Sequence, residues 1–130
     1  MIVLHGGFMI AALLLMAAGA VTARFMKKKR WWLKIHRVLE TAGYASLLAG
    51  LLAAVVMVSL FSGRHLALPH AWLGVIIVIG AAGTLAMGLL QFTMPKGART
   101  LRPLHRWSGR ITLVLLTINI LSGLTLIGII

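Results

Sequence analysis

The chain has 130 residues, 61% of them hydrophobic, and its net charge is +12, with thirteen Lys and Arg residues against one acidic residue. Soluble domains are roughly half apolar, so this composition and a mean hydropathy of +1.04 exclude a soluble globular protein and indicate a membrane protein. There is no cysteine, which excludes disulfides, iron–sulfur clusters and the covalent attachment of c-type haem. The single acidic residue leaves no carboxylate pair and no catalytic triad for a hydrolase or transferase.

Four apolar segments are each long enough to cross a bilayer, which takes about 20 residues. The first is expected over residues 3–23, and because no positive charge precedes it, we interpret it as a span and not as a secretory signal. The second is expected over residues 32–61 and the third over residues 69–92, with Pro69 in its first turn and a break at residues 94–97. The fourth is expected to open at Pro103 and to continue to Ile130. We therefore predict an all-α membrane protein, a four-transmembrane-helix up-down bundle, with residues 1–130 as a single domain.

Basic residues gather around two of the three connections. Every Lys and Arg except Arg64 lies near the first connection (Arg24, Lys27, Lys28, Lys29, Arg30, Lys34 and Arg37) or the third (Lys96, Arg99, Arg102, Arg106 and Arg110). The positive-inside rule places these two connections in the cytoplasm and both termini on the other side. We interpret the cluster mainly as a topology determinant that meets anionic lipid, with an anionic substrate or acidic partner as the alternative; no nucleic acid is expected.

A histidine stands at the head of each apolar segment: His5, His36, His70 and His105, at intervals of 31, 34 and 35 residues. Steps of four and three residues from each histidine follow one helix face. These faces collect small and polar residues, among them Glu40, Gly74, Gln91, Gly109 and Asn119. Close helix packing alone explains small residues in a membrane, but beside four histidines the glycines are better explained as room for a flat macrocycle.

The depth of each histidine predicts how the four are paired. Helices one and three start on one side of the membrane and helices two and four on the other, so His5 lies level with His70, and His36 with His105. These pairs are the diagonals of an up-down bundle, as two bis-histidine haem irons require. We expect two b-type haems in layers about 20 Å apart. A zinc or copper site is disfavoured because its ligands would need one depth, and His65 is assigned to the surface. The alternative for each single histidine is a hydrogen-bonded structural residue.

Together these residues resemble the cytochrome b561 superfamily, in particular the four-helix core of its DOMON-linked and short bacterial members. The matching elements are His5-Gly6 with Met9, Ala23-Arg24, Trp32 with His36-Arg37, His70 with Gly74 and Gln91, and His105 with Gly109-Arg110 and Asn119-Ile120. The resemblance implies two haems b on the same histidine pairs. It also implies transmembrane electron transfer as an oxidoreductase component. Gly74, Gly109, Glu40, Gln91 and Asn119 would then belong to the haem pockets or support the ligands.

Glu40 departs from the glutamine that many members carry four residues after the second-helix histidine. Helical side chains lean toward the N-terminus, so Glu40 can reach His36 or Arg37. Two interpretations stay open: an ion pair at the inner interface, or an acceptor that tunes the imidazole or couples a proton to reduction.

The sequence thus predicts a dihaem carrier that links a quinol or other reductant to a redox partner across the membrane. The alternative is a haem-free membrane anchor within a larger complex. Expected partners are the lipid bilayer, a redox partner protein or a quinone or small reductant, and a second copy of the chain or other subunits. The expected location is the cytoplasmic membrane of a prokaryote, with both termini non-cytoplasmic.

Overall fold

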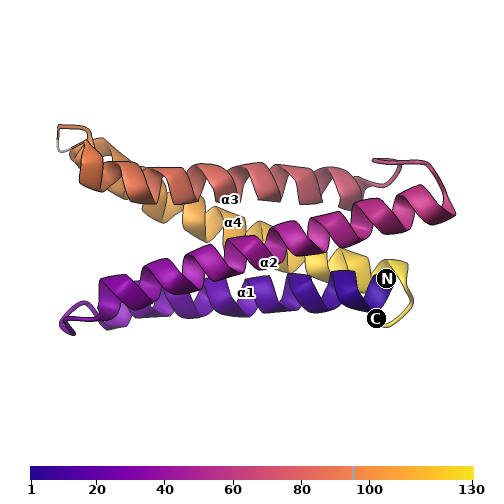
Figure 1. Ribbon diagram of the computed structural model, residues 1–130, viewed down its shortest axis with the longest axis horizontal. Helices are drawn as coiled ribbons and strands as arrows, with labels where there is room; N and C mark the ends of the chain where they lie inside the picture. The colour runs from indigo at the N-terminus through magenta and orange to yellow at the C-terminus, as the bar shows by residue number, and fades with distance from the viewer. Residues whose placement is uncertain (95) are drawn as a thin grey trace.

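The computed structural model describes residues 1–94 and 96–130 and contains, in that part of the chain, four helices and no strand (Figure 1). They are α1 (Ile2–Phe25), α2 (Trp32–Phe61), α3 (Pro69–Thr93) and α4 (Ala98–Leu126). Each is long and apolar enough to span a membrane. The predicted fold class, an all-α membrane protein with four transmembrane helices in an up-down bundle, is confirmed. Pro95, part of the predicted break after the third span, lies outside the described residues.

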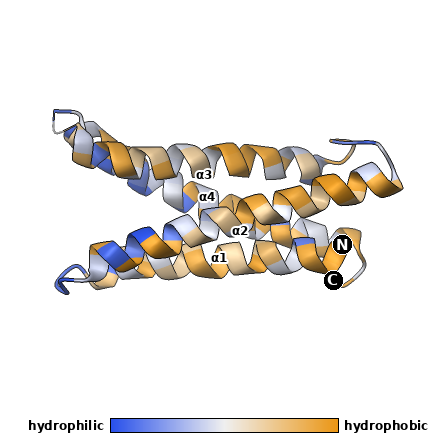
Figure 2. Ribbon diagram, viewed as in Figure 1, coloured by the Kyte–Doolittle hydropathy of each residue, from blue (hydrophilic) through white to orange (hydrophobic). Residues whose placement is uncertain are grey.

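The four helices form two antiparallel hairpins. Helix α1 packs closely along α2, and α3 along α4, whereas α1–α4 and α2–α3 contacts between the hairpins are sparser (Figure 1). The α1–α2 and α3–α4 connections lie at one end, which we call the basic end; both termini and the α2–α3 connection lie at the other, the terminal end (Figure 1). Figure 2 shows hydrophilic residues gathered at the basic end and hydrophobic residues along the middle of the helices.

Local sequence explains most helix boundaries. Pro69 occupies the first turn of α3, where its missing N–H would be unpaired anyway, and Leu68 before it is extended, as the residue preceding a proline prefers. Helix α2 ends in a turn in which the Gly63 N–H donates to the Val58 carbonyl at 2.8 Å. This turn needs the left-handed backbone of Gly63, φ +64°, which glycine adopts without a steric penalty.

The prediction for the fourth helix was wrong at both ends. Helix α4 begins at Ala98, so that Pro103 lies inside the helix, and it ends at Leu126 instead of Ile130. The backbone N–H groups of Thr100 and Leu101 donate to the Gly97 carbonyl and start the helix before the proline. Pro103 removes only the hydrogen bond to the Arg99 carbonyl, and it is tolerated because it is exposed near the helix start, where water can replace that bond.

The core is one buried stripe along each helix. In all four helices the residues seven and eleven positions after the histidine are buried: Ala12, Met16, Gly43, Leu47, Ile77, Ala81, Thr112 and Leu116. Many large apolar side chains on the other faces are exposed, as expected where lipid and not protein surrounds a helix. The stripe therefore points the histidine face of every helix toward the bundle axis.

Candidate functional site

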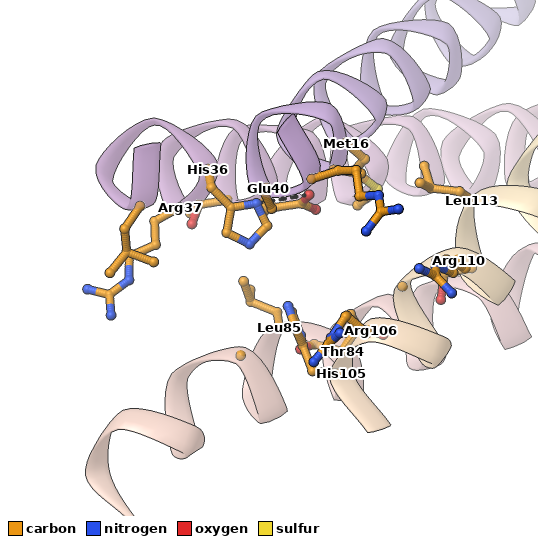
Figure 3. Close-up of a pocket in the computed structure, with 18 of the residues that line it drawn as sticks. Met16, His36, Arg37, Glu40, Thr84, Leu85, His105, Arg106, Arg110 and Leu113 are labelled. Carbon is orange, nitrogen blue, oxygen red and sulfur yellow. Dashed lines mark hydrogen bonds and ion pairs between the residues drawn. The ribbon is translucent and has the colours of Figure 1, made fainter. Parts of the chain in front are cut away.

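Two pairs of histidines face each other across the bundle. The ring centres of His36 on α2 and His105 on α4 are 6.1 Å apart, with ring planes 81° apart. Those of His5 on α1 and His70 on α3 are also 6.1 Å apart, at 85°. Figure 3 shows His36 and His105 pointing toward one another from opposite walls of a pocket. The structure thus brings together the same histidines that the depth argument paired, and each pair joins one hairpin to the other.

Each of these four rings uses its Nδ1 atom within its own hairpin. Nδ1 of His5 lies 2.9 Å from the Gly50 carbonyl, that of His36 3.0 Å from the Gly19 carbonyl and that of His105 2.8 Å from the Thr84 carbonyl; that of His70 lies 3.0 Å from the Ser122 hydroxyl. A carbonyl can only accept, so Nδ1 carries the hydrogen in the first three rings. In the neutral ring, Nε2 then keeps its lone pair for a metal, and an Nδ1–H bond of this kind is the usual support of a metal-ligating histidine.

The acceptors follow a fixed spacing. Gly19, Gly50 and Thr84 each lie fourteen residues after the histidine of their own helix, and Asn119, whose carbonyl accepts from Ser122, lies fourteen residues after His105. Fourteen residues of helix rise about 21 Å. Each helix therefore supplies a histidine to one layer and a supporting carbonyl to the other, and this spacing sets the distance between the layers.

A cavity of about 750 Å³ opens around His36 and His105 at the basic end, and all four helices line it (Figure 3). This volume is within the range of about 300–1,000 Å³ typical of ligand sites. Its walls include apolar side chains such as Met16, Leu85 and Leu113, and its other lining residues include six cations: Arg24, Lys27, Arg37, Arg102, Arg106 and Arg110.

Comparison with protein families identifies the type of protein. The family model described as eukaryotic cytochrome b561 matches residues 4–129. The chain belongs to the cytochrome b561 family. This membership indicates haem b as cofactor and electron transport across a membrane as function. Searches of curated proteins and of solved structures gave no match.

The residues of the two layers fit the haem b of a cytochrome b561. Two imidazoles on one iron need ring centres about 6 Å apart, since each metal–nitrogen bond is about 2 Å and each nitrogen lies about 1 Å from its ring centre. Both pairs meet this requirement. Among the residues that the structure describes, no three His, Cys, Asp or Glu side chains gather at one point. Two ligands per layer suit an iron that already has four porphyrin nitrogens, whereas zinc takes four ligands. His65 is exposed in the α2–α3 connection, with its Nε2 3.2 Å from the Ser59 hydroxyl.

Two glycines lie against histidine rings of the two pairs, and they are not the two glycines that the sequence singled out. A Cβ atom on Gly88 would lie 2.9 Å from Cε1 of His105, and one on Gly123 would lie 2.9 Å from Cε1 of His70. At Gly74 and Gly109 the nearest atoms, on Asn119 and Thr84, would be at 3.4 and 3.5 Å, in ordinary contact. A pocket role for Gly74 and Gly109 stays a prediction, and the structure adds Gly88 and Gly123 as residues that leave room for the rings of His105 and His70.

Glu40 lies beside His36 and not in a hydrogen bond with it. Its carboxylate is 3.6 Å from Nδ1 of His36, too long for a hydrogen bond, and that nitrogen already has the Gly19 carbonyl as acceptor. Arg37, the other partner considered for Glu40, instead lies over the ring of Phe92 on α3, 4.5 Å from its centre. Glu40 is thus a neighbouring carboxyl group in the layer of His36 and His105, and Arg37 forms a cation–π contact between the hairpins.

The remaining predicted pocket residues lie in different places. Gln91 lines the cavity, and its amide donates to the Gly88 carbonyl at 3.0 Å. Asn119 is buried near Gly74, and its side-chain oxygen has no hydrogen-bond partner among the described residues. A buried, unpaired oxygen of this kind is uncommon and fits a polar group or water at that point.

Sequence reasoning missed the residues that support the four paired histidines. Ser122 was not considered, although it lies three residues after Asn119 on the same helix. The spacing of fourteen residues was the available signal. It could have pointed to Gly19, Gly50 and Thr84 as acceptors only if the rotation of the neighbouring helices had been known.

Proposed function

We propose that the chain carries electrons across the membrane through two bis-histidine haems b, one held by His5 and His70 and the other by His36 and His105. The observation that carries this proposal is the repeated ligand geometry. Both pairs have ring centres 6.1 Å apart, and all four rings have Nδ1 engaged, so that Nε2 is the nitrogen left for iron. Residues 1–130 would then act as one dihaem domain.

The protein's own part in this function is to hold and orient the haems and to keep water away from the space between them. Haem b supplies a one-electron couple of its iron when it is bound. The hairpins fix the imidazoles, and the buried side chains between the layers, including Leu47, Ile77 and Leu116, keep water out. With layers about 21 Å apart between ligand levels, the edges of the two macrocycles would be considerably closer. This arrangement supports a path that covers most of the bilayer.

The two ends of the path would differ in their surroundings. The cavity at His36 and His105 is lined by six cations, whereas Arg64 is the one basic residue of the α2–α3 connection. We propose that the basic end faces the cytoplasm of a prokaryotic cell, so that both termini lie outside it. A quinol, another small reductant or a partner subunit would deliver electrons at one end and a redox partner would receive them at the other. The open cavity favours the basic end as an approach to a haem.

A reduced-minus-oxidised absorption spectrum of the purified, detergent-solubilised protein tests the proposal. The expected result is a b-type spectrum and about two haems per chain by pyridine haemochrome assay. His65→Ala is the matched control, because it removes a histidine from outside both pairs and should leave the haem content unchanged. A folded protein without a haem spectrum would contradict the proposal and favour the haem-free membrane anchor.

A further inference from the structure

The layer of His5 and His70, which we call the outer layer, contains one histidine whose support differs from the others, whereas both histidines of the inner layer, His36 and His105, are supported alike. Three of the four histidines donate their Nδ1–H directly to a backbone carbonyl fourteen residues after another histidine. At the fourth, the equivalent carbonyl belongs to Asn119 and also lies near His70, but the group at 3.0 Å from the ring nitrogen is the Ser122 hydroxyl, which itself donates to that carbonyl. His70 is therefore the histidine whose hydrogen-bond partner at 3.0 Å is a side chain, and substitution can remove that partner.

The direction of the hydrogen bonds at Ser122 follows from its second contact. The Ser122 hydroxyl donates to the Asn119 carbonyl at 2.9 Å, and it has a single hydrogen to give. Its oxygen must then accept from His70 Nδ1–H, 3.0 Å away. Ser122 thus links the Asn119 carbonyl to the His70 ring through two hydrogen bonds. It gives His70 the same tautomer as the other three histidines, with Nε2 free. The ring also lies against Gly123, where no side chain could fit without displacing it.

We propose that Ser122 is a positioning residue for the outer haem site: it fixes the tautomer and the rotation of His70 and strengthens its imidazole as a ligand. This inference rests on the proposed haem ligation. A hydrogen bond from Nδ1–H makes the imidazole more basic, and a more basic ligand favours the oxidised iron. Loss of the hydroxyl should therefore weaken haem binding at one of the two sites and raise its midpoint potential.

Serine at position 108 gives a closely matched control. Ser108 lies on the same helix, fourteen residues before Ser122, is similarly half-buried, and likewise donates to the carbonyl three residues earlier, at 3.2 Å. Its side chain contacts the hydroxyl of Thr84 at 2.9 Å, whereas the ring of His105 is bonded to the Thr84 carbonyl. Ser108→Ala thus removes an equivalent hydroxyl and an equivalent helix contact without removing the acceptor of a ligand ring.

The experiment compares Ser122→Ala with Ser108→Ala in the purified full chain by redox titration, electron paramagnetic resonance and haem retention. In Ser122→Ala one of two midpoint potentials should rise, one low-spin signal should shift, and the affinity of one haem should fall about 10- to 100-fold, as on loss of such partners elsewhere. Ser108→Ala should match the wild type in all three. Identical behaviour of the two variants would overturn the inference.

A second pair keeps the inference testable if the alanine variant does not fold. Ser122→Thr keeps the hydroxyl, and Ser122→Val has nearly the same shape without it. Threonine should preserve both potentials and valine should change one, and equal results for the two would refute the role of the hydroxyl. A wild-type protein without haem would instead refute the proposed function.

Discussion

The rings of His105 and His70 are each held by contacts on two sides, so small changes beside them should matter. A hydrogen bond such as that from His105 to the Thr84 carbonyl contributes about 0.5–1.5 kcal/mol net, and it also selects one tautomer. The ring edge meets Gly88 on α3, where a Cβ atom would be 2.9 Å from Cε1. The Thr84 carbonyl thus fixes the rotation of the imidazole, and Gly88 leaves the space that the ring occupies.

We expect Gly88→Ala to displace the His105 ring and to lower the haem content at the inner layer, because the added methyl group overlaps the ring. Gly83→Ala is the control: it makes the same substitution on the same helix, α3, with no atom within 4 Å of the added methyl group, and should bind haem as the wild type does. Haem per folded protein measures both. Equal haem content in the two variants would show that the ring has room to move.

The histidines could be predicted from the sequence, but their supports could not. His5, His36, His70 and His105 repeat one position relative to four apolar segments, and this information lies within each segment. The contacts of Gly88 and Ser122 with rings on the neighbouring helix depend on how two helices are rotated against each other, which no single segment specifies. Gly74 was singled out because it shares a helix face with His70, but residues on one face do not all contact the same neighbours.

At the scale of the helices, α1 and α2 pack tightly against each other at glycines. A Cβ atom on Gly43 would lie 2.7 Å from Cγ of Met16 and 3.3 Å from backbone atoms of α1 at Ala12 and Met16. Backbone atoms of a helix cannot move aside as the end of a side chain can. Small residues of this kind let membrane helices pack through van der Waals contact, so Gly43 holds the first hairpin together.

Gly43→Ala should therefore push α1 and α2 apart and lower stability by about 1–3 kcal/mol, the usual effect of overpacking. Gly83→Ala is the matched control inside α3, because no atom lies within 4 Å of its added methyl group. Thermal unfolding in detergent, followed by circular dichroism, compares the two. A midpoint for Gly43→Ala equal to that of Gly83→Ala would contradict the close packing of the first hairpin.

A helix boundary could be predicted where one local residue decides it. It could not be predicted where the preceding residues start the helix despite that residue. Pro69 marks the start of α3 because its extended predecessor and its missing N–H both suit a first turn. Pro103 carries the same signal but lies inside α4, since the residues from Ala98 onward start the helix and water can pair the freed carbonyl. Proline prefers the first turn of a helix, but near an exposed helix end it is also tolerated one turn further in.

At the scale of the whole molecule, the two hairpins touch each other sparsely, and the histidine pairs lie between them. The charge distribution makes the two ends of the molecule different. All Lys and Arg residues but Arg64 surround the two connections of the basic end. The sequence could supply this asymmetry, but not the shape of the cavity, which depends on how far the hairpins diverge around His36 and His105.

The orientation predicts that a reporter enzyme active only in the cytoplasm should be silent when it is fused after Ile130, because the positive-inside rule places the terminal end outside. The same reporter inserted in the α1–α2 connection should be active and serves as the control. An active fusion after Ile130 would reverse the orientation and exchange the inner and outer layers.

The most direct test of the central claim asks whether the four histidines act as two independent pairs. Each single His→Ala variant should retain about one haem of two, because the other layer shares no ligand with the damaged one. The double variant His5→Ala with His70→Ala should also retain about one haem, since both changes affect one site, whereas His5→Ala with His36→Ala should approach zero. Haem per folded protein, by pyridine haemochrome assay, is the measurement. A haem-free His5 and His70 double variant beside a His5 and His36 double variant that keeps one haem would contradict the pairing and the path across the membrane.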